Sequence, residues 1–270
     1  MQKKIDGITA PNPDDTLWRY MSFEKFLNML ATESLFFTRA YKYEDPFEGY
    51  LPQLMIELNK SNPNIKEVLD GDMLGYLSRF EIELKYVMCN CWHQNEDESM
   101  AMWEKYHIRN SGIAIKTTME KLKNSITNTI DVYIGNIEYI SREEFHSSYV
   151  LQYLSNESLR YPTTLYLPYF QKRKVFEYEQ EVRVIIHIDS GKFDKLKPEE
   201  YMDPRSIEAE FPDMDDQGRA YSVDLNTLID EIIISPYSEH WIEDTVSSVI
   251  QQYGFTFEVH PSTLLDDPDY

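Results

Sequence analysis

Two carboxylates and a guanidinium occur at alternate positions in the segment Tyr-Glu-Gln-Glu-Val-Arg, as Glu179, Glu181 and Arg183. If a strand begins here, its period of two places all three side chains on one face. Arg183 would then hold one carboxylate while the other faces a substrate. A structural ion-pair ladder explains the same pattern and, as a bare pattern, is the more common outcome.

Further polar candidates lie early in the chain. Arg19 stands between two aromatic residues in a predicted strand, where it can bind phosphate in a fork geometry or cover a sheet edge. Asp45 and Glu48 belong to an Asp-Pro-Phe-Glu turn in the aromatic and charged loop 39–50. These two carboxylates can clamp a ribose hydroxyl or close the loop, and such loops often line sites.

Cys89, Cys91 and His93 alternate along another predicted strand, with Asp97 and Glu98 close behind. These residue types bind metals, so metal-dependent hydrolysis is one hypothesis. The ligand spacing is narrower than in structural zinc sites, and small cysteines commonly fill cores. We therefore expect core packing for both cysteines and no metal.

Trp103 and Tyr106 lie three residues apart on a predicted helix, a spacing typical of core residues but also of a wall that stacks on a planar ring. The sequence has no Gly-rich phosphate loop, no Gly-x-Ser-x-Gly elbow and no His-Glu-x-x-His motif. Their absence argues against conventional Rossmann, kinase, hydrolase and zincin functions.

The chain of 270 residues has 47 acidic and 26 basic residues, for a formal net charge of −21. Such a field repels phosphate backbones and anionic lipid, which argues against membrane surfaces and general nucleic-acid binding. A few arginines can still create an anion site, because salt screens charges over about 10 Å. We also expect a cytoplasmic protein, since the sequence shows no secretory signal, no membrane-spanning run and only two cysteines.

Hydrophobic periodicity predicts a flexible arm at 1–16 followed by a single α+β domain at 17–270. This domain has a mixed, mostly antiparallel sheet with flanking helices, a helical insertion near 53–86 and an acidic surface excursion near 190–219. We expect Ser22 and Ser99 to cap helices. Predicted strands lie at 35–38, 86–92, 113–116, 131–140, 181–188, 229–235 and 255–260, and further helices at 142–160 and 238–253.

An ordered series of motifs resembles a bacterial family of domains of unknown function over about residues 17 to 262. The motifs are Trp18-Arg-Tyr-Met-Ser, Asp45-Pro-Phe-Glu, Cys91-Trp-His with Glu98-Ser-Met-Ala-Met-Trp-Glu-Lys-Tyr, Gly112-Ile-Ala-Ile and Tyr178-Glu-Gln-Glu-Val-Arg. The bacterial setting of this family suggests a toxin or phage-defence role.

The order of elements in turn resembles the ADP-ribosyltransferase fold, in which an early strand supplies Arg or His and a late strand supplies Glu. The resemblance implies that Arg19 holds the diphosphate or nicotinamide ribose of NAD, that Tyr20 or another aromatic stacks on nicotinamide, and that Glu181 binds the ribose and stabilises an oxocarbenium-like transition state. The middle strand of that fold carries Ser or Thr, which residues 88–92 lack.

We therefore expect Arg19, the 39–50 loop, Trp103 and Glu181 to converge on one cleft. The first hypothesis is an NAD-using ADP-ribosyltransferase-like enzyme or NAD glycohydrolase, which transfers ADP-ribose to an unknown macromolecular acceptor or to water. The alternative is a non-catalytic sensing domain that binds a nucleotide or a protein in the same cleft. The absent middle hydroxyl favours this alternative.

Overall fold

The structure is a computed structural model that describes residues 2–3, 8–43, 45, 47–49, 84–106, 111–127, 131–141, 162–188 and 216–268. Its strands are β1 (Gln2–Lys3), β2 (Thr16–Ser22), β3 (Ser34–Arg39), β4 (Val87–Gln94), β5 (Gly112–Thr118), β6 (Val132–Asn136), β7 (Glu138–Ile140), β8 (Gln171–Arg173), β9 (Glu181–His187), β10 (Gly218–Ser222), β11 (Glu231–Ile234) and β12 (Glu258–Pro261). Its α-helices are α1 (Phe23–Thr32), α5 (Met100–Lys105), α6 (Met119–Ser125), α11 (Leu225–Leu228) and α12 (Trp241–Gln252). Short 3₁₀ helices are η1 (Ala40–Lys42), η2 (Leu84–Tyr86), η4 (Pro162–Phe170) and η5 (Lys174–Glu179).

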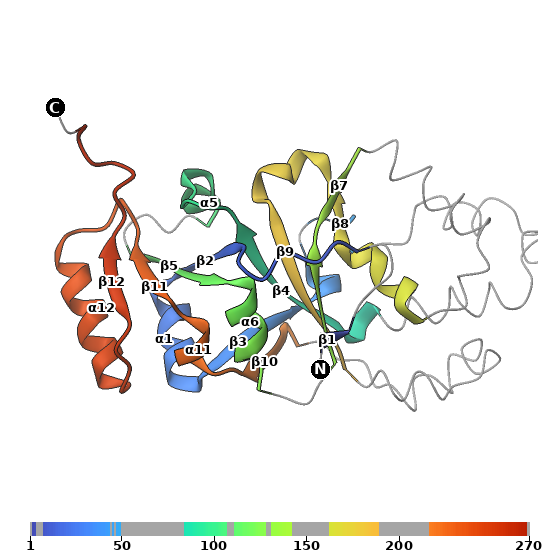
Figure 1. Ribbon diagram of the computed structural model, residues 1–270, viewed down its shortest axis with the longest axis horizontal. Coiled ribbons are helices and arrows are strands. Elements are labelled where there is room, and N and C mark those ends of the chain that lie inside the picture. Colours follow the sequence, from blue (N-terminus) through green and yellow to red (C-terminus); the bar gives the residue numbers. More distant parts are fainter. Residues whose placement is uncertain are drawn as a thin grey trace, which may run out of the picture.

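Ten of the described strands form one sheet in the order β1-β6-β9-β4-β2-β5-β11-β12, with β3 beside β4 and β10 beside β3 (Figure 1). Neighbouring strands are antiparallel except for the pairs β1–β6 and β11–β12. A parallel pair of β7 and β8 lies outside this sheet. The predicted α+β class with a mixed, mostly antiparallel sheet is confirmed.

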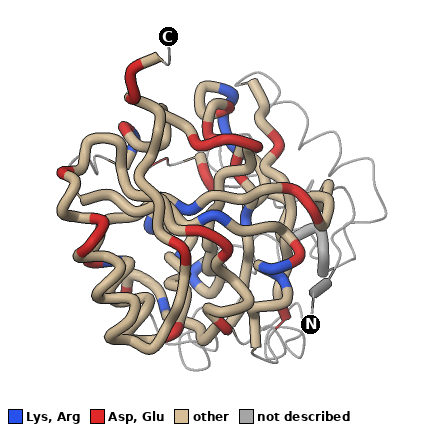
Figure 2. Tube along the Cα trace, turned by 60° about the vertical axis from the view of Figure 1, so that its left-hand side comes forward, with Lys and Arg blue, Asp and Glu red and all other residues tan. Residues whose placement is uncertain are grey.

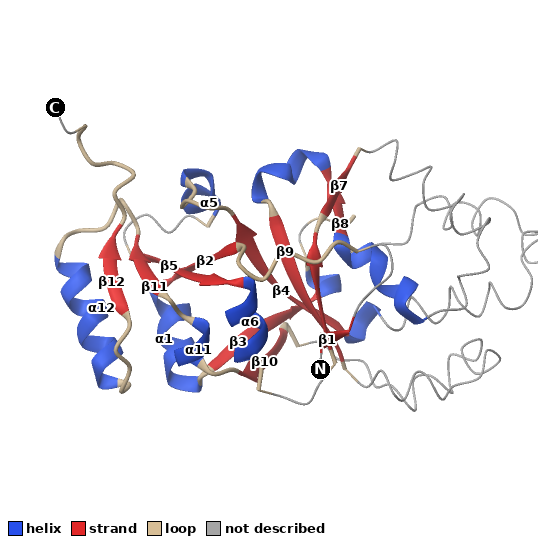
Figure 3. Cartoon of the chain, in the orientation of Figure 1, coloured by secondary structure: helices blue, strands red, loops and turns tan. Residues whose placement is uncertain are grey.

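The two faces of the sheet are covered differently (Figure 3). On one face, apolar side chains of the strands pack against α1, α6, α11 and α12 in one large hydrophobic cluster. The other face carries two smaller clusters. One joins β4, β6 and β9 to η4 and includes Cys89, Tyr133, Tyr169 and Ile185. The second joins β2, β5 and β11 to α5 and includes Trp18, Tyr20, Met102 and Trp103.

Strand β4 is the point at which the sheet divides. Along one edge it pairs with β9 from Val87 to His93. Along the other edge it pairs with β3 at Met88 and Cys89, and with β2 only at His93 and Gln94. Residues 90–92 therefore have no paired strand on that edge in the described sheet, and β2 and β3 diverge around them.

The side chain of Asn90 occupies this division. Its Nδ2 donates to the main-chain oxygen of Phe36 on β3 at 2.9 Å, and its Oδ1 accepts from Nε1 of Trp92 at 2.7 Å. Asn90 and Trp92 are both buried. One amide thus satisfies a carbonyl that the diverging strands leave unpaired and an indole N–H in the core.

The N-terminal segment differs from the predicted flexible arm. Gln2 and Lys3 form β1, and Thr9 accepts a main-chain hydrogen bond from Asn136 at 2.9 Å. Asp15 accepts one from Met119 at 3.0 Å. These bonds fix the described part of the arm to the domain, which its polar composition did not indicate.

Other boundaries also differ from the predictions. The end of the predicted acidic excursion forms β10, which extends the sheet beside β3 because its residues pair with Ser34–Thr38. Ser22 and Ser99 stand at the N-cap positions of α1 and α5, but neither side chain makes a capping hydrogen bond. The insertion up to residue 83, the helix predicted at 142–160 and residues 190–215 lie outside the described residues.

Acidic residues occur in several separate parts of the chain, with Lys and Arg between them (Figure 2). Within the described ranges, no helix has the length and apolar character needed to cross a membrane.

We predict that Asn90→Ala lowers the free energy of unfolding by about 1 to 3 kcal/mol, because it leaves the buried indole N–H of Trp92 and the carbonyl of Phe36 without their partner. Urea denaturation measures the change. Asn226→Ala, at an exposed position of α11, is the control and is expected to change stability by less than about 0.5 kcal/mol. Equal effects of the two substitutions would contradict the role given to Asn90.

Candidate functional site

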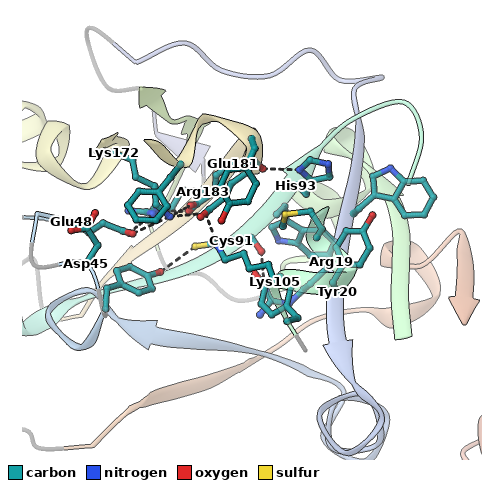
Figure 4. Close-up of a pocket in the computed structure, with 18 of the residues that line it drawn as sticks. Arg19, Tyr20, Asp45, Glu48, Cys91, His93, Lys105, Lys172, Glu181 and Arg183 are labelled. Atoms are coloured by element: carbon teal, nitrogen blue, oxygen red, sulfur yellow. Dashed lines mark hydrogen bonds and ion pairs between the residues drawn. The ribbon is translucent and has the colours of Figure 1, made fainter. Parts of the chain in front are cut away.

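A cavity of about 540 Å³ opens on the sheet face between the two smaller hydrophobic clusters, and its size is typical of small-molecule sites (Figure 4). Five cationic and four acidic side chains line it, in a chain whose net charge is −21. The cations are Arg19, Lys105, Lys172, Arg173 and Arg183, and the acids are Asp45, Glu48, Glu179 and Glu181. The lining of the cavity thus has a small excess of cationic side chains, although the whole chain is strongly acidic.

Strand alternation places four of the polar residues. Cys91 and His93 on β4 point to the same face as Glu181 and Arg183 on β9, since Cys91 is the register partner of Arg183 and His93 that of Glu181. Their apolar neighbours Trp92 and Val182 belong to the large cluster on the opposite face. The predicted alternation from residue 181 onward thus positions the polar wall of the cavity.

Glu181 is a buried and ionised carboxylate. Its Oε1 accepts from Nε of Arg183 at 2.7 Å and its Oε2 from Nζ of Lys172 at 3.1 Å. Burial by itself would raise the pKa of Glu181, but the positive charges of Arg183 and Lys172 outweigh it and lower the pKa to about 2. The group therefore carries a full negative charge at neutral pH.

Lys172 is the centre of this network, which the sequence analysis missed. Besides Glu181, its ammonium group contacts Glu179 Oε2 at 2.7 Å and Glu48 Oε1 at 3.0 Å. Burial would lower the pKa of Lys172, whereas the carboxylates of Glu181 and Glu48 raise it above its ordinary value. Glu48 also accepts from Nη2 of Arg183 at 2.7 Å, so the two cations and Glu48 and Glu181 form a closed ring of ion pairs.

Glu179 joins the network from the end of η5 and not, as the alternation predicted, from the strand that carries Glu181. The strand begins at Glu181, Glu179 ends η5, and Gln180 between them has a left-handed conformation with φ 38°. The strand predicted at 181–188 is therefore confirmed, but its alternation does not extend back to Glu179. The turn nevertheless brings Glu179 to Lys172, and its carboxylate also pairs with Lys105 at 2.7 Å.

Arg19 lies where β2 diverges from β4. Its Nη1 donates to the main-chain oxygen of Cys91 at 2.6 Å, and its guanidinium carbon lies 5.7 Å from the centre of the Trp92 ring. No carboxylate pairs with Arg19 within the described parts of the chain. It therefore leaves guanidinium N–H donors available at the cavity for an anion.

The Asp-Pro-Phe-Glu turn lies on the opposite side of the cavity from Arg19 (Figure 4). Asp45 accepts from Nε of Arg173 at 3.0 Å and from the main-chain N–H of Phe47 at 3.1 Å. Asp45 and Glu48 are thus both at the cavity, as predicted, but each is paired with a cation. In this arrangement they close the loop and anchor the ionic wall.

The three predicted aromatic contacts fall in different environments. Tyr20 lines the cavity but is only 4% exposed, and its hydroxyl accepts from the main-chain N–H of Ser99 at 2.8 Å. Trp103 is fully buried behind Tyr20, with ring centres 4.8 Å apart, and does not line the cavity. Tyr106 and Tyr178 are 39% and 48% exposed and line the cavity. These last two rings are the open surfaces on which a planar group can stack.

The cysteines separate into a core residue and a cavity residue. Cys89 is buried in a hydrophobic cluster, as predicted, whereas Cys91 lines the cavity, with its Sγ 3.1 Å from the hydroxyl of Tyr43. Burial, followed by the nearby charge of Glu181, raises the pKa of Cys91 to about 12, so the thiol keeps its proton. Among the residues described, no group of three His, Cys, Asp or Glu side chains is arranged to hold a metal ion.

His93 lines the cavity beside Tyr20. Its Nδ1 lies 2.7 Å from the main-chain oxygen of Glu179, and its ring meets that of Tyr20 edge to face at 6.2 Å. Burial lowers the pKa of His93, although the Glu179 carbonyl opposes the shift, so the ring is neutral at neutral pH. Its Nε2 is buried and makes no hydrogen bond with any described residue.

Some residues that line the cavity were not predicted from the sequence, and two of them belong to a recognisable basic run. Lys172 and Arg173 belong to a Gln-Lys-Arg-Lys run, which is unusual in so acidic a chain and precedes the Glu179 segment by few residues. Lys105 and Tyr43 carry no comparable signal, because each is a single residue within a helix or loop.

Comparisons with known proteins give limited matches. The model of a family described as "Protein of unknown function (DUF2971)" matches residues 102–184, which include Glu181 but not Arg19. Two structures of Thermus sp. 2.9 DarT, one in complex with NAD⁺ and one with ADP-ribosylated ssDNA, are similar over 94% of this chain. The matched regions cover 98% and 96% of the two DarT chains. The sequence identity is 8% in both matches, and the TM-scores are 0.39 and 0.38. No curated protein matches this chain.

We predict that the ionised carboxylate of Glu181 makes the free energy of unfolding decrease as the pH is lowered. A carboxyl whose pKa falls on folding, here from 4.5 to about 2, stabilises the fold above its unfolded pKa and loses this contribution as pH falls towards the folded value. At about 1.4 kcal/mol per pKa unit, the loss between about pH 5 and about pH 2 is on the order of 3 kcal/mol. Urea unfolding over that range measures it.

Glu181→Gln is expected to have a flatter stability profile in this acid range and a lower stability at neutral pH, because Arg183 and Lys172 lose a partner. Glu177→Gln, on the exposed side of η5, is the matched control and should keep the wild-type slope. If Glu181→Gln also keeps that slope, the carboxylate is not held by the network.

Proposed function

We propose that this cavity binds NAD and that the chain is an ADP-ribosyltransferase-like enzyme, which cleaves the bond between nicotinamide and ribose. One observation carries the proposal: a carboxylate held ionised, Glu181, lines the same cavity as Arg19, a cation without an acidic partner among the described residues. Exposed aromatic rings at Tyr106 and Tyr178 supply stacking surfaces. An anionic ligand with planar rings matches this combination.

In the proposed reaction the bond from the ribose C1′ to the nicotinamide nitrogen breaks, and its electron pair leaves with neutral nicotinamide. The ribose becomes an oxocarbenium-like cation. A fixed negative charge at Glu181 stabilises this developing positive charge. Water or a nucleophile of a macromolecular acceptor then forms the new bond at C1′ and releases a proton.

The neighbours of Glu181 have supporting roles in this scheme. Arg183 and Lys172 keep the carboxylate ionised and fix its orientation, so little reorganisation is needed when charge develops. Arg19 binds the diphosphate of NAD through its available N–H groups. Glu179, paired with Lys105, is a further carboxylate at the cavity and a candidate base for the acceptor.

A second candidate function is a nucleotide-binding module without catalysis. The observation that favours it is the saturation of Glu181, which already accepts hydrogen bonds from both Arg183 and Lys172. A carboxylate so engaged has few remaining sites for a ribose hydroxyl. In this function the same cavity would bind the nucleotide and leave it intact.

Release of nicotinamide from NAD, measured by chromatography with and without cell extract as a source of acceptor, tests the enzyme. We expect release by the wild-type chain and a loss of at least about a hundredfold in Glu181→Gln, since a charge that stabilises the transition state typically contributes several kcal/mol. Because Glu181→Gln also lowers stability, the assay must be run well below its melting temperature. NAD binding without any release would instead support the binding module.

Arg19 gives a test of binding that is less coupled to folding, since its side chain makes a single hydrogen bond with the described residues. Arg19→Ala is expected to weaken the binding of NAD and of ADP-ribose by about ten- to a hundredfold in calorimetry. Lys123→Ala removes the same charge from an exposed position on α6 and is the control. If both variants bind like the wild type, or if the wild type binds neither ligand, the proposed site is wrong.

A further inference from the structure

The ring of His93 has a defined tautomer. Its Nδ1 lies 2.7 Å from the main-chain oxygen of Glu179, and a carbonyl oxygen can only accept a hydrogen bond. Nδ1 therefore carries the proton. In the neutral ring Nε2 then has a lone pair and no hydrogen, so it can only accept.

This acceptor is buried and makes no hydrogen bond with any residue in the described ranges. Buried polar atoms of folded proteins nearly always have a partner, so an unpaired one requires an explanation. His93 lines the cavity, and its Nε2 has almost no accessible surface, so a ligand group reaches it only after a local shift of neighbouring atoms. An unpaired acceptor on a residue that lines the cavity can be satisfied by a donor on a ligand.

The surroundings of His93 restrict the kind of ligand group. His93 lies between Trp18 on β2 and Glu181 on β9 in the strand register, and its ring meets that of Tyr20. The charged groups that face it are Glu179 from η5 and Lys105 from α5. Aromatic neighbours favour a planar ring, and a neutral acceptor nitrogen requires a group that donates a hydrogen bond.

We propose that Nε2 of His93 accepts a hydrogen bond from an uncharged N–H donor on a planar ring, and that in NAD this donor is the carboxamide of nicotinamide. The inference rests on the proposed function and adds to it a determinant of specificity. A ring that bears a carboxylate in place of the carboxamide presents only acceptors to Nε2. His93 thus selects nicotinamide over nicotinic acid.

Calorimetric binding of NAD and of nicotinic acid adenine dinucleotide to the same protein tests this proposal. Because the deamidated ligand leaves Nε2 unpaired and faces it with lone pairs, we expect the wild type to prefer NAD by about ten- to a hundredfold. The additional negative charge of the deamidated ligand would by itself favour binding beside Arg19. A preference for NAD is therefore opposite to the effect of net charge.

Two variants assign the preference to His93. His93→Gln carries an amide that can turn either its oxygen or its NH₂ group to the ligand, so the preference is expected to shrink to within about threefold. His93→Phe keeps a ring but removes the acceptor, and should lose most of the preference through weaker binding of NAD. Melting temperatures show whether each variant is folded, and His93→Gln carries the test if His93→Phe is not.

The outcomes separate this inference from the proposed function. If the wild type binds NAD and its deamidated form equally, the role of His93 is wrong and NAD binding stands. If either folded variant keeps the wild-type preference, the discrimination arises elsewhere and the inference is also wrong. If the wild type binds neither dinucleotide, both the inference and the proposed function fail.

Discussion

The requirement that a buried charge be paired shapes the candidate site more than any other constraint. Glu181 and Arg183 are fixed on one face of β9, where neither can reach bulk water. Burying an isolated ion costs many kcal/mol, so each needs partners supplied by other parts of the chain. Lys172 and Glu48 provide them, and the loop that carries Glu48 is thereby tied to the sheet. The ion pairs thus give the cavity a fixed wall as well as an ionised carboxylate.

The second structural cause of the site is the divergence of β2 and β3 along β4. A continuous sheet would pair every main-chain group of residues 90–92 and leave no space beside them. Where the strands separate, polar side chains satisfy the freed groups: Asn90 binds the carbonyl of Phe36, and Arg19 binds that of Cys91. Arg19 reaches the cavity only because β2 leaves β4 immediately after Trp18. The cavity and its available cation therefore have a common origin in the sheet.

The paired buried charges and the divergence of β2 and β3 together explain how a strongly acidic chain can contain a cavity lined by several cations. Acidic residues are spread over the molecule, whereas the cations of the cavity are concentrated on a short run around Lys172 and on three other elements. A charged ligand would meet these cations at short range, where they outweigh the distant surface charge. The net charge of a protein thus gives poor guidance about the ligand of an enclosed site.

Much of the fold follows from local patterns that the sequence carries by itself. Period-two alternation predicted β2, β4, β5 and β9 and identified the face shared by Glu181 and Arg183, because side-chain direction in a strand depends only on local geometry. The α+β class was predicted from the order of strand and helix patterns along the chain. Tertiary structure alone decided which residues meet. Lys172 pairs with Glu48 across more than a hundred residues of chain, Trp103 is enclosed by α5 and β2, and His93 retains an unpaired acceptor. Such contacts depend on strand order and on the divergence at β4, which result from packing of the whole chain and leave no periodic signal in the sequence.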